Sequence, residues 1–190
     1  MRKLTGLLLG AFIVLALAAG AQAVMVVQLD FNQDGIYDQT GQLKPGDEVA
    51  VDIYVSDIPA PGLGAMGFKL IFDSEKLEVI LGSTQVDATN WPAGDFVELV
   101  QPGELHMAGF RLLPGLSGND IQLATVQLRC LKPGASTLTL FDRTDETDDF
   151  VLVDDPDNPT VLDSDIAGGV LLAGIAPPSL TSILMILLLD

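Results

Sequence analysis

Side chains that can ligate a metal ion recur at alternate positions in one short stretch near the amino terminus. Counted as positions 1, 3, 5 and 9 of a loop, these oxygen donors are Asp30, Asn32, Asp34 and Asp38. Gly35 at position 6 permits a sharp bend, and Ile36 at position 7 offers its backbone carbonyl. Because Ca²⁺ takes about six to eight oxygen ligands, this spacing predicts a calcium site.

The stretch resembles the calcium loops of EF-hands and dockerins, but it departs from both at position 12. Gly41 stands there in place of the acidic residue that closes those sites. A bound ion would therefore be held weakly or would need a further carboxylate. The alternative is a plain hairpin, in which Met25–Leu29 and a strand from Ile36 are joined by a polar Asp-Gly turn without a metal.

The chain offers little for catalysis. His106 is the only histidine, and its apolar neighbours Leu105 and Met107 place it on the polar side of a strand, as a surface residue. The sequence contains no nucleophile elbow, zinc-protease helix motif, phosphate loop or cysteine metal pair. A glycosidase needs two carboxylates close together in space. Among 26 acidic residues such a pair can arise by chance, so the sequence does not indicate one. We expect no catalytic residue and a protein that is not an enzyme.

Trp91 is the best single candidate for a residue that stacks on a sugar ring. It lies in a predicted loop, within Asn90-Trp91-Pro92, where an aromatic ring can face a ligand. The alternative is that Trp91 is an aromatic residue of the loop whose ring folds over the edge of the domain.

The two ends of the chain differ from its middle. Arg2 and Lys3 precede an apolar run, and Ala21-Gln22-Ala23 supplies a small-residue cleavage site, so residues 1–23 are predicted to be a signal peptide. Export to the periplasm or the extracellular space follows, with no transmembrane span after cleavage. One domain is expected over residues 24–176. The apolar tail over 177–190 is too short to cross a bilayer as a helix, and a truncated sorting tail, a peripheral contact and an extra strand all stay open.

The formal net charge of −17 disfavours nucleic acids and anionic lipid surfaces as partners, because both need basic patches. Cations and basic surfaces fit this charge better. The acidic segment Asp142–Asp165 offers Asp154, Asp155 and Asp157 for a second cation, although a solvated loop is the favoured interpretation. Cys130 is the only cysteine, and its alternation with apolar residues predicts a buried side chain.

Alternation with a period of two residues dominates the chain and predicts strands. It is clearest in 49–55, 68–72 and 124–130, and weaker in 25–29, 77–81, 96–100, 105–110, 137–141, 150–153 and 168–172. Proline-glycine turn signals separate these segments, and no long stretch has helical periodicity. We predict an all-β fold, a jelly-roll β-sandwich of about nine antiparallel strands.

Residues Leu43–Ser56, followed by Gly67–Asp73 and Leu77–Val79, resemble the opening of a cohesin domain. In that family a P-G-D-x-V strand leads through a loop to a strand that ends in an aromatic residue and Asp. A weaker likeness extends to residue 141. The resemblance implies a nine-stranded jelly roll related to carbohydrate-binding modules. It also implies a non-catalytic module that holds dockerin-bearing enzymes on polysaccharide-degrading scaffolds, and it assigns no partner-binding residue.

The sequence thus predicts an exported cohesin-like binding or scaffolding module whose partner is a protein, of the dockerin type if the resemblance extends to function. Two other interpretations stay open. A carbohydrate-binding module, with a polysaccharide as partner, would show a row of exposed aromatic residues beyond Trp91. A calcium-stabilised structural surface protein would show a large effect of the metal on melting without any other ligand.

Overall fold

The computed structural model describes residues 25–31, 33–38, 40–142, 149–155, 157, 160–162, 164–166 and 169–173. The expected signal peptide, the carboxyl-terminal tail and the loop residue Asn32 lie outside these residues. Within the described part of the chain, no helix is long and apolar enough to cross a membrane.

Strands make up most of the described chain, with a single 3₁₀ turn among them. The elements are β1 (Met25–Phe31), β2 (Thr40–Leu43), β3 (Glu48–Ser56), β4 (Ile58–Ile71), β5 (Leu77–Val79), η1 (Leu81–Ser83), β6 (Gln85–Val86), β7 (Gly94–Gln101), β8 (Glu104–Phe110), β9 (Leu116–Gly118), β10 (Ile121–Cys130), β11 (Gly134–Asp142), β12 (Phe150–Leu152), β13 (Val161–Leu162), β14 (Ser164–Ile166) and β15 (Gly169–Ala173). Every strand segment expected from the sequence is present. The short strands β2, β6, β9, β13 and β14 were not expected, because none of them places two apolar residues on either side of a polar one.

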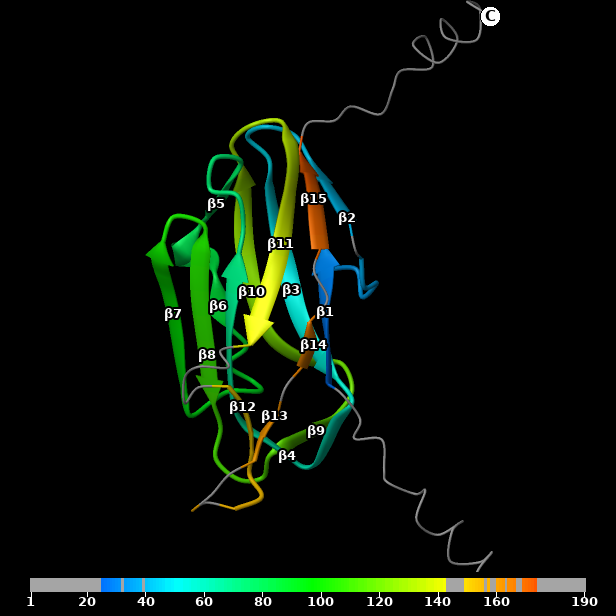
Figure 1. Ribbon diagram of the computed structural model, residues 1–190, viewed down its shortest axis with the longest axis vertical. Helices are drawn as coiled ribbons and strands as arrows, with labels where there is room; N and C mark the ends of the chain where they lie inside the picture. The colour runs from blue at the N-terminus through cyan, green and yellow to red at the C-terminus, as the bar shows by residue number, and fades with distance from the viewer. Residues whose placement is uncertain are drawn as a thin grey trace, which may run out of the picture.

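The strands form two sheets (Figure 1). Their inward side chains share one core. The first sheet has the order β14-β1-β3-β10-β5, with β6 also paired to β10. The second has the order β13-β12-β4-β11-β15-β2, and β8 joins β4 to the outer strand β7. The expected β-sandwich is therefore confirmed.

Alternation along the central strands builds the core. In β3, Val49, Val51, Ile53 and Val55 are all buried, while the residues between them face outward. Burying each such side chain contributes roughly 1.5–3 kcal/mol relative to leaving it in water. Cys130 at the end of β10 is 1% exposed, as the sequence predicted.

Most neighbouring strands are antiparallel, as expected, and two pairs at the edge are parallel. β1 pairs with β14 in parallel, and β2 pairs with β15 in parallel. The physical reason is that both end segments of the described chain run the same way along one edge of the sandwich. Each segment also switches sheets, since β1 and β14 belong to the first sheet and β2 and β15 to the second.

The 14-residue strand β4 is the centre of the second sheet. Its first part pairs with β9 and β12, and its second part lies between β8 and β11. The outward face of β7, β8, β4 and β11 is hereafter called the second-sheet face. The outward face of β1, β3 and β10 is called the first-sheet face.

Candidate binding surfaces

The loop after β1 folds back on itself so that its carboxylates converge. Gln33 and Gly35 have φ angles of 60° and 79°, in the left-handed region that lets the chain bend sharply. The backbone N–H of Gly35 donates to Asp30 Oδ2 at 2.9 Å, and that of Asp34 donates to Asp30 Oδ1 at 3.3 Å. Carboxylate oxygens of Asp30, Asp34 and Asp38 all lie within 4.8 Å of one another. The loop thus gathers three of the predicted metal ligands.

Two predicted ligands stay predictions, the side chain of Asn32 and the backbone carbonyl of Ile36. Asn32 lies outside the described residues, and Ile36 is an exposed residue whose N–H donates to Asp34 Oδ1 at 2.9 Å. The loop is closed at its far end by the Asp38 N–H, which donates to the Leu29 carbonyl at 2.9 Å.

A fourth carboxylate, which the sequence analysis missed, lies beside this loop. Asp52 of β3 is directly opposite Asp30 of β1, and the two residues are only 5% and 1% exposed. Asp52 Oδ1 accepts hydrogen bonds from Gln33 Nε2 at 3.0 Å and from Thr125 Oγ1 at 2.5 Å. None of the ion pairs within the described residues involves either carboxylate. Two buried acids facing each other destabilise a sheet unless hydrogen bonds or a cation offset their repulsion.

Two tyrosines stand next to these acids on the first-sheet face. The ring centroids of Tyr37 and Tyr54 are 5.6 Å apart, with the ring planes inclined at 58°. The Tyr37 hydroxyl donates to Asp120 Oδ1 at 2.5 Å. Burial and the hydrogen bond to Asp120 raise the pKa of Tyr37, and burial and the charge of Asp52 raise the pKa of Tyr54.

Trp91 does not offer a platform for a sugar, which corrects the sequence-based expectation. The side chain is 1% exposed and belongs to the core, where it packs against β8 at Gly109. Its Nε1 donates to the Gln122 carbonyl at 3.3 Å, so the polar edge of the indole is satisfied inside the protein. The alternative interpretation, an aromatic residue folded over the edge of the domain, is closer to what the structure shows.

The second-sheet face has small residues at its centre and aromatic residues around them. Gly67 of β4 pairs with Ala108 of β8, and Ala108 pairs with Phe96 of β7. Phe96 is 42% exposed, and Phe110 at the end of β8 is 41% exposed. The sequence analysis did not single out these phenylalanines, because alternation alone does not tell which side of a strand faces the core.

Charged residues cross the same face in one row. His106 of β8 lies opposite Lys69 of β4 on one side and opposite Glu98 of β7 on the other. His106 Nε2 is 2.7 Å from Glu104 Oε1, and this hydrogen bond lowers the pKa of Glu104. The expected surface histidine thus lies on an outward face, but its side chain is only 13% exposed because these neighbours cover it.

An apolar cavity of about 340 Å³ adjoins the second-sheet face at the end of β8. Ala65 of β4, Leu113 and Val151 of β12 are among its lining residues. The neighbouring side chains of Leu112 and Leu113 are 79% and 77% exposed. The described surface therefore concentrates exposed apolar atoms at this end of the sandwich.

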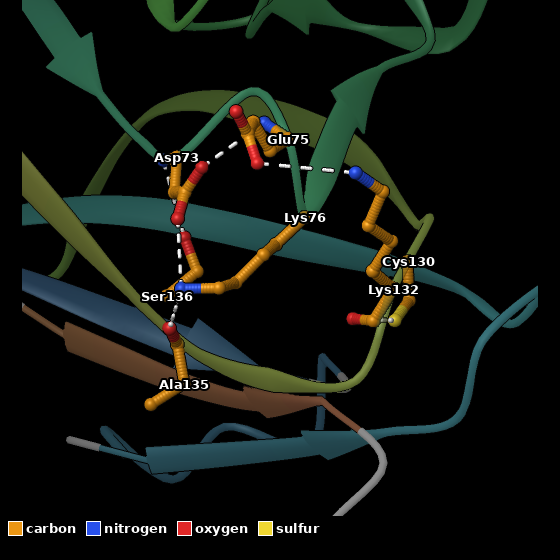
Figure 2. A network of polar contacts seen from close by, with 7 residues as sticks. All are labelled: Asp73, Glu75, Lys76, Cys130, Lys132, Ala135 and Ser136. Carbon is orange, nitrogen blue, oxygen red and sulfur yellow. Dashed lines mark hydrogen bonds and ion pairs between the residues drawn. The ribbon is translucent and has the colours of Figure 1, made fainter.

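A polar network fastens the turn after β4 to the start of β11 (Figure 2). Lys76 Nζ lies 2.8 Å from Asp73 Oδ2 and donates to the Ala135 carbonyl at 2.9 Å. The buried Ser136 hydroxyl accepts from the Asp73 N–H at 3.2 Å. The ammonium of Lys76 lowers the pKa of Asp73. These contacts tie two strands of one sheet together, and their role is structural.

The acidic segment does not gather its carboxylates where the structure describes it. Asp154 accepts a hydrogen bond from the Thr160 N–H at 3.0 Å and another from the Thr160 hydroxyl, and these bonds lower its pKa. Asp155 accepts from the Asp157 N–H at 2.9 Å. Among the described residues, only the group around Asp30 brings three acids together. The hydrogen bonds of Asp154 and Asp155 stabilise the connection between β12 and β13.

The fold and these surfaces define a class: a non-catalytic β-sandwich binding module. The family model of the cohesin domain matches residues 36–154, which is more than half of the chain. The chain belongs to the cohesin family.

Three similar solved structures share the fold but are remote in sequence. The cohesin CaCohA2 of Clostridium acetobutylicum is 17% identical, with 83% of this chain and 95% of that chain covered and a TM-score of 0.57. The seventh ScaB type I cohesin of Pseudobacteroides cellulosolvens is 14% identical, with 82% and 96% covered and a TM-score of 0.58. A type I cohesin–dockerin complex from Clostridium thermocellum gives 16% identity, 80% and 94% coverage and a TM-score of 0.56. A search of curated proteins found no match.

Proposed function

We propose that this chain is an extracytoplasmic interaction module that binds a dockerin-type protein domain through its second-sheet face. Family membership supports this proposal, and so do the similar structures that are complexes of a cohesin with a dockerin. The observation that carries it is the arrangement of Phe96 and Phe110 around the small residues Gly67 and Ala108.

The physical argument rests on the kind of surface that proteins use to bind one another. Such surfaces combine aromatic side chains at the centre with polar and charged residues at the rim. Phe96 and Phe110 supply apolar area that water would otherwise cover. Lys69 and Glu98 supply charges that orient a partner.

Titration calorimetry with a panel of purified dockerin domains tests this function, and the panel includes the dockerin that forms a complex with CaCohA2. We expect binding of at least one dockerin, and the double substitution Phe96→Ala with Phe110→Ala weakens it at least about tenfold, or roughly 1.4 kcal/mol. Gln127→Ala, on the opposite sheet, serves as the control and leaves the affinity unchanged. Failure of every dockerin to bind, or unchanged binding by the double variant, contradicts the proposal.

The setting of this function follows from the sequence. The predicted signal peptide over residues 1–23 supports export, and cohesin modules typically belong to extracellular scaffolds. Within this proposal the module recruits an enzyme that carries a dockerin, in the degradation of polysaccharides.

We propose in addition that Ca²⁺ binds the loop after β1. The converging oxygens of Asp30, Asp34 and Asp38 support this, and so does the buried Asp52 opposite Asp30. Because Gly41 replaces the acid at position 12, the site needs a further carboxylate, and Asp52 is the candidate for it. In this role the ion offsets the repulsion among four carboxylates and fixes the loop over the first-sheet face. A calcium-dependent rise in the melting temperature is the test, described in the Discussion.

A further inference from the structure

The first-sheet face carries a row of side chains that the proposed function does not use. Gln28 of β1 pairs with Tyr54 of β3, and Tyr54 pairs on its other side with Gln122 of β10. All three side chains point outward and are partly exposed. A tyrosine ring therefore stands between two amide groups on three adjacent strands.

A second tyrosine completes this row from the loop after β1. Tyr37 lies 5.6 Å from Tyr54 between ring centroids, and its hydroxyl is held by Asp120 at 2.5 Å. The Ser56 hydroxyl lies 3.3 Å from Gln28 Oε1 and 3.4 Å from Asp120 Oδ1. Because hydrogen bonds fix these side chains in the free protein, little conformational entropy is lost when a ligand binds.

The protein interior positions Gln122. Trp91 Nε1 and Asn90 Nδ2 both donate to the Gln122 carbonyl, at 3.3 and 3.0 Å. A break in the pairing register between Gln122 and Ala124 places Gln122 opposite Tyr54. Trp91 thus acts as a buried support behind this row, on the side away from solvent.

The chemistry of this face excludes two classes of ligand. No large apolar side chain on β1, β3 or β10 is among the exposed ones, so the described face lacks the apolar centre of a protein interface. Its arginine, Arg129, is paired with Glu48 at 2.7 Å and Glu78 at 3.0 Å, and the nearby carboxylates repel anions. The amide and phenol groups of the row both donate and accept hydrogen bonds, which fits a neutral ligand rich in hydroxyl groups.

We propose that the row Gln28, Tyr54 and Gln122, together with Tyr37, binds a single chain of a neutral polysaccharide. Amide and carboxylate groups exchange pairs of hydrogen bonds with neighbouring sugar hydroxyls, and the tyrosine rings pack against the apolar faces of sugar rings. The 58° angle between the rings leaves no common plane for a flat crystalline surface. The ligand is therefore a soluble chain that can bend from one ring to the other.

This site lies on the opposite sheet from the proposed dockerin surface, so the two proposals can fail separately. Affinity electrophoresis in gels that contain barley β-glucan, xyloglucan or glucomannan tests it, with CaCl₂ in every lane. We expect at least one of these neutral polysaccharides to retard the protein. Tyr54→Ala and Gln122→Ala each weaken that retardation at least tenfold, whereas the control Leu131→Ala, at an exposed position outside both proposed surfaces, does not. Thermal melts check that each variant is folded, and Gln28→Ala replaces any variant that is not.

Three results would overturn the proposal. The first is no retardation by any of the three neutral polysaccharides. The second is unchanged retardation of the folded variants. The third is binding of the acidic polysaccharide polygalacturonate, or of microcrystalline cellulose, as strong as that of the neutral soluble chains.

Discussion

The indole of Trp91 lies directly against the backbone of Gly109. A methyl group at position 109 would come within 2.8 Å of Trp91 Cγ and 2.9 Å of Trp91 Cβ, which is closer than carbon atoms pack. Only a residue without a side chain leaves room for the ring. The sequence places Trp91 beside a proline in a turn, but burial of its ring depends on Gly109, which is distant in sequence.

Gly109→Ala is therefore expected to destabilise the domain by about 1–3 kcal/mol, the usual cost of overpacking. Chemical denaturation measures this change. Gly82→Ala is the matched control, because nothing lies within 4 Å of a methyl group there, and it should leave the stability unchanged or slightly raised. Equal effects of the two substitutions would show that the ring has room to move.

The chain contains only two tyrosines, so absorbance at alkaline pH reports both. Burial raises the pKa of each above its ordinary value of 10.0, and Asp120 adds to the shift at Tyr37. The neutral phenols therefore stabilise the fold below about pH 10, and this contribution is lost as the pH rises toward the folded-state pKa. We expect the native protein to titrate at higher pH than the unfolded chain. Tyr37→Phe should leave a single tyrosine that ionises at raised pH. A titration midpoint at the ordinary tyrosine pKa in the native protein would contradict the geometry.

Calcium is expected to stabilise the protein through the loop after β1. At a concentration a hundredfold above the dissociation constant, binding adds about 2.7 kcal/mol and raises Tm by roughly 5–10 °C. Melts in EGTA and in millimolar CaCl₂ measure the difference. Asp30→Asn with Asp34→Asn should abolish it, whereas Asp154→Asn, which also removes an acid, should preserve it. Identical melts of the unaltered protein in the two buffers would exclude the site.

Cys130 should be inert in the native protein. Its side chain is 1% exposed, and burial raises the pKa of its thiol, so little thiolate forms at neutral pH. Iodoacetamide labelling followed by mass spectrometry should be at least about a hundredfold slower in buffer than in guanidinium chloride. Comparable rates would place the thiol at the surface.

Alternating residues made the long strands predictable, since one face of each strand must be buried. The alternation of β3 and β10 was read directly from the sequence, and both strands form the centre of the first sheet. Parallel pairing of the end strands was not predictable, because it depends on contacts between residues such as Met25 and Ser164 that lie far apart in the chain. The missed strands β2, β6, β9, β13 and β14 contain no pair of apolar residues separated by a polar one, so they carry no alternation.

The candidate sites also differ in whether their residues are close together in the sequence or only in the fold. Asp30, Asp34 and Asp38 lie within one loop, so their spacing alone was informative. Asp52 joins them through the register between β1 and β3, which is fixed only when the strands pair. The surfaces around Phe96 and Tyr54 likewise gather residues from several strands, and the sequence could not show which of them would meet.

The parallel pairing of the end strands also determines how the domain carries tension. The start of β1 and the end of β15 lie at opposite ends of the paired edge, because Met25 pairs with Ser164 and Ala173 pairs with Leu43 (Figure 1). A pull on these two points acts along the strands. The hydrogen bonds of β1 with β14, and of β2 with β15, are then sheared together instead of opening one after another. Within the proposed function, in which the module links a scaffold to an enzyme, this edge would resist extension.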